Sequence, residues 1–152
     1  MPQQNLDRDL LYLLNDVARL MRTKFDQRAR TYGMTRAQWV ILSRLENQPG
    51  LSQNEMAAIV EVEPITIARL IDRLQASGFV ERRADPKDRR IWRLHLTSAA
   101  EPMLAEIKKH KEELRSEIMA GVDPATTDLM VDNLLKLKAN LTSDGRTILR
   151  AV

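Results

Sequence analysis

The sequence predicts a mainly α-helical protein with one small β-hairpin. Apolar residues recur at helical spacing through most of the chain, and Ser or Thr followed by Gln or Glu three positions later marks several helix starts. Alternation of apolar and polar residues is confined to one stretch, 91–96. With 152 residues, 43% of them apolar, the chain has the size and composition of a single domain, 1–152.

The first two helices are defined by their apolar stripes and by their ends. A long amphipathic helix is expected over residues 6–32, and Gly33 ends it. Thr35 and Gln38 form a capping box that begins a second helix. This helix reaches about residue 46, where the turn sequence NQPG stops it.

A pair of shorter helices is predicted over residues 52–78. Ser52 and Glu55 form another capping box, and Pro64 takes the first position of the following helix, which ends before Gly78. The residues of this last helix that face inward on the helical pattern are Ile67, Leu70, Ile71 and Leu74. The spacing is that of a helix-turn-helix, although such pairs also occur as plain packing in helical proteins.

The residues after this pair predict an antiparallel hairpin. Segments 79–83 and 91–96 can pair around a loop that reads DPKDRR. Alternation places Trp92, Leu94 and Leu96 on the inner face and Ile91, Arg93 and His95 on the outer face. A helix-turn-helix followed directly by a hairpin with a basic tip is a winged helix-turn-helix, here residues 35–97.

Two more helices follow the hairpin. Ser98 and Glu101 predict a third capping box and a helix to about residue 121, and Asp123 with Pro124 begins the last helix. Apolar residues cover too much of the last helix for contact with one neighbour. We therefore expect segments 6–32 and 98–152 to be dimerisation helices that flank the winged domain; the alternative is that both ends simply pack on that domain.

The positive charge of the chain is concentrated in one segment. Residues 69–93 contain eight bases and four acids, a net charge of +4, whereas the remaining sixteen bases and seventeen acids sum to −1. A polyanion is the partner that such a localised excess favours.

Composition also excludes several classes. The absence of Cys removes disulfides, thiol chemistry and Cys-based zinc sites, and no metal or cofactor is expected with two isolated His. Neither a phosphate-binding Gly loop nor a convergent catalytic set occurs, which argues against an enzyme. Without a long apolar run or a signal peptide, we expect a cytoplasmic protein with no membrane partner.

The hairpin loop resembles that of the MarR-type bacterial transcriptional regulators. Their wing has the form D-x-R/K-D-x-R, which stands here as Asp85, Lys87, Asp88 and Arg90, followed by WRLHLT. The resemblance extends over the whole chain in element order, and AEPMLAEI and EIMAG are similar to the SlyA branch. It implies a homodimer that reads two half-sites of double-stranded DNA.

The predicted DNA contacts lie on the second helix of the pair, at the start of the first, and in the wing. Thr66 and Arg69 point outward if the apolar residues point in; Arg73 suits a phosphate, or else an acid on its own helix. In the wing, the resemblance implies that Asp88 orients a neighbouring Arg, for which Arg90 is the candidate. The full predicted set is Ser52, Gln53, Pro64, Thr66, Arg69, Arg73, Lys87, Asp88, Arg89 and Arg90.

Two of these assignments have specific reasons. Ser52 and Gln53 stand at a helix start, where backbone N–H groups favour phosphate. The resemblance implies that Arg89 or Lys87 reaches the minor groove, but Lys87 stands where the family usually has Arg, and Lys lacks the bidentate geometry of Arg.

The resemblance also implies an effector site. Relatives bind small aromatic or phenolic acids in a cleft between the dimer helices and the winged domain, and Arg19, Arg22 and Trp39 stand at positions similar to those that line it. Cations beside an aromatic ring suit an aromatic carboxylate or its acyl conjugate. The alternative is that Trp39 belongs to the core and both Arg side chains are solvated.

Together these features predict a sequence-specific regulator, a repressor or anti-silencer. It would bind a pseudo-palindromic operator as a homodimer and be released by a small ligand. A helical protein-interaction module without DNA binding is the alternative, and salt-dependent DNA affinity separates the two.

Overall fold

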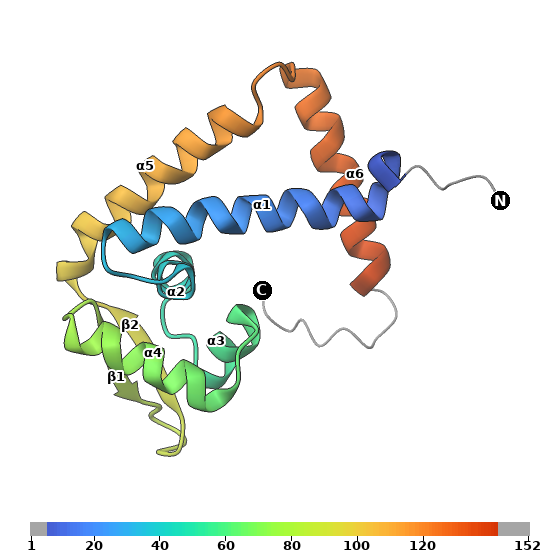
Figure 1. Ribbon diagram of the computed structural model, residues 1–152. Coiled ribbons are helices and arrows are strands. Elements are labelled where there is room, and N and C mark those ends of the chain that lie inside the picture. Colours follow the sequence, from blue (N-terminus) through green and yellow to red (C-terminus); the bar gives the residue numbers. More distant parts are fainter. Residues whose placement is uncertain (1–5, 143–152) are drawn as a thin grey trace.

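The computed structural model describes residues 6–142 and confirms the mainly helical fold class with a hairpin wing (Figure 1). Within these residues the helices are α1 (Leu10–Thr31), α2 (Arg36–Asn47), α3 (Gln53–Val60), α4 (Pro64–Ala76), α5 (Glu101–Ile118) and α6 (Pro124–Thr142). The strands are β1 (Val80–Ala84) and β2 (Trp92–Leu96), and short 3-10 helices occupy Leu6–Arg8 and Ser98–Ala100. The ends of the predicted domain, 1–5 and 143–152, lie outside the described residues.

The elements form a winged domain, made of α2, α3, α4 and the hairpin, and a helical arm, made of α1, α5 and α6. In Figure 1, α2, α3, α4 and the hairpin lie together below one end of α1. From the hairpin, α5 runs up and away above α1, and α6 turns back across the N-terminal half of α1 in this view. None of the described helices is both long and apolar enough to cross a membrane.

The first helix begins later than the sequence predicted. Residues 6–8 form a 3-10 turn, and α1 starts at Leu10 because Asp9 is its N-cap. The Asp9 carboxylate accepts hydrogen bonds from the backbone N–H groups of Leu11 at 2.9 Å and Tyr12 at 3.3 Å. At its other end, Gly33 has a φ of +68°, as a helix-ending glycine requires.

Two of the three predicted capping boxes are present. The Thr35–Gln38 and Ser52–Glu55 pairs each make both reciprocal hydrogen bonds. The third prediction was wrong: Ser98 lies in a 3-10 turn without a side-chain cap, and α5 begins at Glu101. The hairpin is instead fastened at this point by Thr97, whose hydroxyl donates to the carbonyl of Gly78.

The hairpin pairs in the predicted antiparallel sense, with Val80 opposite Leu96 and Ala84 opposite Trp92. A third short segment, residues 50–51, forms hydrogen bonds with β2, which the sequence did not predict. The Gly50 N–H donates to Leu94 O and the Leu94 N–H donates to Leu51 O, both at 2.9 Å. These bonds anchor the wing to the chain that leads into α3.

One inner-face prediction for the hairpin was wrong. Leu94 is fully buried and Leu96 packs partly against the core, but Trp92 is 45% exposed. Trp92 pairs with Ala84 at the loop end of the hairpin, where the buried core of α2 and α4 no longer covers the strand.

The core belongs to the winged domain, and the arm adds little to it. Its largest buried side chains come from α2, α3, α4 and the hairpin, with Ile107 from α5. No residue of α6 within the described chain is buried. Exposed apolar side chains on α1 and α6 include Leu10, Leu11, Leu13, Val17, Leu20, Leu129, Met130, Val131, Leu134 and Leu135.

Candidate nucleic-acid interface and ligand cleft

The outward face of α4 is polar and basic, as its inward pattern predicted. The four predicted inward residues, Ile67, Leu70, Ile71 and Leu74, are all buried. Pro64, Thr66, Arg69 and Arg73 are exposed. Within residues 6–142, neither Arg69 nor Arg73 has an ion-pair partner, so both guanidinium groups are available to another molecule.

Sequence reasoning missed one apolar residue on this face. Ile65, in the first turn of α4, is 65% exposed and lies between Pro64 and Thr66. A large apolar side chain beside the expected base-reading residues suits contact with a thymine methyl group. The sequence could have indicated this, because Ile65 does not fall on the helical face that carries the buried residues of α4.

The two residues predicted at the start of α3 are both engaged within the protein. Ser52 is the N-cap, and its hydroxyl accepts from the Glu55 N–H at 3.1 Å. The side-chain oxygen of Gln53 accepts from Arg82 Nε at 3.0 Å. These contacts hold the N-terminus of α3 in place and leave the Gln53 amide nitrogen as the group that could donate to a phosphate.

A partly buried guanidinium connects the wing to both helices of the pair. Besides its bond to Gln53, Arg82 of β1 donates to Gln75 Oε1 at 2.9 Å and to the carbonyl of Ala68 at 3.1 Å. Its Nη1 also lies 2.7 Å from Asp72 Oδ1, and its side chain is 18% exposed. Sequence analysis counted Arg82 only as part of the basic excess, because this network depends on tertiary contacts.

Asp85 organises the base of the wing loop. Its carboxylate accepts from the Lys87 N–H at 2.8 Å and the Asp88 N–H at 3.1 Å, and from Arg93 Nε at 2.8 Å. The Arg93 guanidinium, followed by the Lys87 N–H, lowers the pKa of Asp85. These hydrogen bonds preform the loop and favour the ionised form of Asp85.

The predicted pairing of Asp88 with Arg90 is present. Arg90 Nε lies 3.1 Å from Asp88 Oδ1, and Arg90 Nη2 lies 3.0 Å from Asp88 Oδ2. This bidentate contact lowers the pKa of Asp88 and raises that of Arg90. The guanidinium of Arg90 nevertheless remains at the surface, with an 89% exposed side chain.

The other cations of the loop are free. Lys87 and Arg89 are exposed, and neither forms an ion pair in the part of the chain that the structure describes. Figure 1 places the hairpin tip and α4 at the end of the molecule opposite the α5–α6 turn. The unpaired cations of helix and wing thus gather at one end of the protein.

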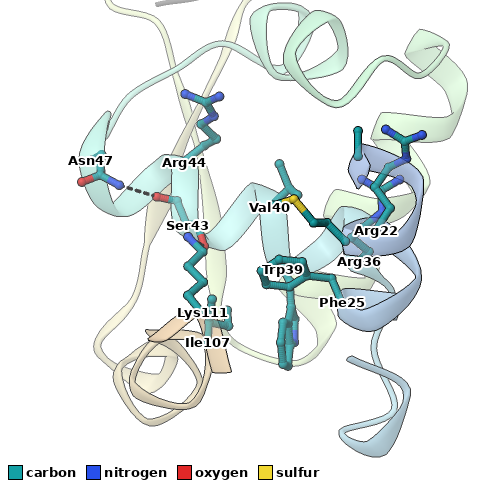
Figure 2. A pocket seen from close by; sticks show the side chains of 12 residues that line it. Arg22, Phe25, Arg36, Trp39, Val40, Ser43, Arg44, Asn47, Ile107 and Lys111 are labelled. Atoms are coloured by element: carbon teal, nitrogen blue, oxygen red, sulfur yellow. Dashed lines mark hydrogen bonds between the residues drawn. The ribbon is translucent and has the colours of Figure 1, made fainter. Parts of the chain in front are cut away.

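A separate cleft of about 520 Å³ lies between α1, α2 and α5 (Figure 2). This size is typical of small-molecule sites. Its lining residues are Ala18, Met21, Arg22, Phe25, Arg36, Trp39, Val40, Ser43, Arg44, Asn47, Ile107 and Lys111.

The charged residues of the cleft are all basic. Four of its lining residues are basic and none is acidic. In the view of Figure 2, Arg22 and Arg36 lie on one side of Val40 and Trp39, and Arg44 and Lys111 lie on the other. Arg36 contacts Asp26 at 3.6 Å, whereas Arg22 and Arg44 form no ion pair within residues 6–142.

The structure brings together two of the three predicted effector residues. Arg22 and Trp39 line the cleft, whereas Arg19 does not and instead contacts Asp16 at 3.3 Å. Trp39 is only 2% exposed, and its ring packs against Tyr32 and His110 with centroids 5.8 Å apart in each case. Trp39 is thus a core residue with one edge on the cleft. Sequence analysis missed Arg36, Arg44 and Lys111, which only the packing of α2 and α5 brings to the same space.

The helix pair, the anchored hairpin and the basic surface define a winged helix-turn-helix protein of the DNA-binding class. Comparison with known proteins specifies the family. The model of the MarR family matches residues 34–92, from the turn before α2 to the start of β2.

Solved structures extend the likeness beyond the winged domain. The transcriptional regulator PA3341 is 33% identical, over 86% of this chain and 96% of that one, with a TM-score of 0.76. A structure of MarR is 28% identical over 93% of this chain and 96% of that one, with a TM-score of 0.80. A protein of the MarR family from Listeria monocytogenes, solved with a 26mer DNA, is 22% identical over 90% of this chain and 91% of that one, with a TM-score of 0.77. This chain belongs to the MarR family of winged-helix transcriptional regulators.

Proposed function

We propose that this protein is a homodimeric regulator that binds a pseudo-palindromic operator and responds to a small anionic ligand. The observation that carries the proposal is the free basic surface at one end of the fold. Arg69 and Arg73 on α4, with Lys87 and Arg89 in the wing, lack intramolecular ion-pair partners among the described residues. Unpaired cations of this kind are the groups that neutralise DNA phosphates.

The place of each residue on α4 or in the wing predicts which part of the DNA it contacts. Thr66 and Arg69 occupy the first two turns of α4, the part of a recognition helix that meets base edges in the major groove. Arg73 lies one turn further on, where a phosphate is the expected partner. Arg89 and Lys87 extend from the wing tip, which suits the adjacent backbone or minor groove. The Listeria monocytogenes protein, which has the same fold, was solved with a 26mer DNA, which supports DNA as the partner.

Dimerisation accounts for the exposed apolar side chains of the arm. In α1 and α6, leucine, valine and methionine side chains face solvent over several turns, because no described neighbour covers them. Contiguous apolar patches of this kind mark protein interfaces. A two-fold dimer through these helices would present two α4 helices to successive major grooves.

The cationic cleft is the proposed effector site. Four basic residues and no acidic one line it, so a carboxylate bound there would pair with a cation and meet no opposing acid in the wall. The cleft lies between α1 of the arm and α2 of the winged domain, so a ligand that prefers one spacing of these elements would shift the separation of the recognition helices. An aromatic or phenolic acid, or its acyl conjugate, fits this description.

Selection of bound sequences from random duplex DNA tests the function directly. We expect an enriched site with two inverted half-sites about 10 bp apart, centre to centre, and an affinity that falls steeply with added salt. An enriched site without two-fold symmetry would contradict the dimer. Binding that is absent at low salt would instead favour a helical interaction module.

A further inference from the structure

A second, smaller hollow adjoins the cationic cleft. It has a volume of about 320 Å³ and lies between α1 and the C-terminal part of α5. It shares Met21, Phe25 and Lys111 with the cleft. The two spaces therefore meet along a common wall at the middle of α1 and α5.

Both spaces have a mainly apolar lining, but they differ in charge. Four basic residues line the cleft, whereas the surface of the hollow is almost wholly apolar. Leu114, Ile118 and Met119 supply its α5 side, and Arg115 also borders it. A ligand that occupied both spaces would need a charged part and an apolar part in sequence.

Lys111 marks the junction between the two spaces. Its ammonium group lies 3.2 Å from Ser43 Oγ, on the cleft side, while the residue also borders the apolar hollow. An anion beside this ammonium group would direct an attached chain past Phe25, which lines both spaces. Long basic side chains commonly combine a charged end with an apolar stem in this manner.

We propose that the effector is an amphipathic carboxylate with a flexible hydrocarbon tail, whose carboxylate lies among the cleft cations and whose tail fills the apolar hollow. This inference rests on the proposed function in treating the cleft as the effector site. It goes further by assigning the hollow as a tail subsite. A compact aromatic acid would occupy the cleft and leave the hollow unfilled.

The test is a chain-length series of straight-chain carboxylates, from butanoate to decanoate, titrated calorimetrically into the full-length protein without DNA. Each methylene that enters the hollow should tighten binding by about 4-fold, the factor that corresponds to about 0.8 kcal/mol of burial. Affinity should stop rising once the hollow is full. Matched primary alcohols should bind much more weakly, because they lack the charge that the cleft recognises.

Two variants test whether the tail lies in the hollow. Ile118→Trp and Met119→Trp fill the hollow from positions in or next to the last turn of α5, and either should abolish the chain-length dependence while butanoate binding persists. Ala120→Trp is the matched control, because Ala120 is exposed and lines neither space. This control should retain the full dependence.

Two results would overturn the inference. One is an affinity that does not change with chain length; the other is a chain-length dependence that survives in both filled variants. Operator binding by the same samples separates this inference from the proposed function. Absence of a chain-length effect in the unmodified protein, with intact operator binding, defeats only the tail subsite. Tail-dependent binding by the unmodified protein without any operator binding defeats the DNA-binding function alone.

Discussion

Arg82 in β1 donates from Nε to the side-chain oxygen of Gln53 in α3 at a distance of 3.0 Å. The same guanidinium reaches Asp72 and Gln75 in α4. One side chain thereby fixes the base of the wing relative to both helices of the helix-turn-helix. Because the spacing of wing and recognition helix decides which phosphates and bases can be reached together, we expect Arg82 to affect DNA binding through the position of the wing.

Arg82→Met should therefore cost both stability and DNA affinity. Removing the guanidinium leaves several acceptors without their donor, and we expect a loss of about 1 to 3 kcal/mol in the free energy of unfolding. Urea denaturation measures this value. Arg83→Met is the matched control, since Arg83 is exposed and, among residues 6–142, forms an ion pair only with Glu81; its effect should stay within about 0.5 kcal/mol. Equal losses in the two variants would contradict the role of the network.

Arg89→Ala should weaken binding to all duplex sequences nearly alike. Arg89 is exposed at the wing tip and has no ion-pair partner among the described residues, so its expected partner is a phosphate. Removing one phosphate contact should lower the slope of log affinity against log salt by about one. Lys109→Ala on α5 removes the same charge from an exposed position outside the winged domain and should leave the slope unchanged. A change in sequence preference without a change in slope would reverse this assignment.

Arg69→Ala and Arg73→Ala should differ although both residues are exposed cations on one helix. Arg69 lies nearer the N-terminus of α4, so its loss should relax base preference at one position of each half-site, at about 1 to 3 kcal/mol. Arg73, one turn later, should behave as a phosphate contact and weaken all sites alike. Repeating the sequence selection with each variant measures the difference. Relaxed preference in Arg73→Ala alone would place the base contacts further along α4.

The sequence predicted local structure well because that structure has local causes. The Thr35–Gln38 and Ser52–Glu55 boxes are complete within four residues, so the sequence alone specifies them. Ser98 and Glu101 match the same pattern, yet the chain leaves β2 through a 3-10 turn held by Thr97. There a tertiary constraint overrides a local signal.

The same limit holds for the candidate sites: residues placed by a local pattern could be predicted, and residues brought together by packing could not. Thr66 and Arg69 could be assigned to the outer face of α4 because the buried residues of that helix fix its orientation. Arg19 could not be separated from Arg22 by resemblance alone, and the structure places only Arg22 at the cleft. Arg44 and Lys111 come from different helices, so no sequence spacing relates them.

Arg22→Gln should reduce the response to an anionic effector. In the unmodified protein, the expected coupling of about 1 to 3 kcal/mol corresponds to a loss of operator affinity of roughly 5- to 150-fold at saturating ligand. Arg22→Gln should shrink this loss, because it removes a cation of the cleft that has no described ion-pair partner. Arg19→Gln is the matched control on the same helix and should respond normally. A full response in the Arg22 variant would remove this residue from the effector site.

His110 should make the folded state sensitive to mild acid. Its ring packs edge-on against Phe25 with centroids 5.1 Å apart, and against Trp39. Burial, followed by the charge of Arg28, lowers the pKa of His110. The charges of Glu113 and Glu117 and a hydrogen bond with the Lys24 backbone oppose this shift. The folded state therefore resists protonation of His110 more than the unfolded state does.

The sign of the effect follows from this difference. As the pH falls through about 6.5, His110 becomes protonated in the unfolded chain while it stays neutral in the folded chain. The free energy of unfolding therefore decreases. Burial also lowers the pKa of His95 on β2, which adds a contribution of the same sign. We expect His110→Gln and His95→Gln each to flatten part of the stability profile between about pH 7.5 and about pH 5.5, and the double variant to flatten most of it. Asp85 and Asp88 lie outside this window because their lowered pKa values place their titration at more acidic pH. Urea midpoints measured across the window provide the test, and a profile as steep in the double variant as in the unmodified protein would show that neither ring controls it.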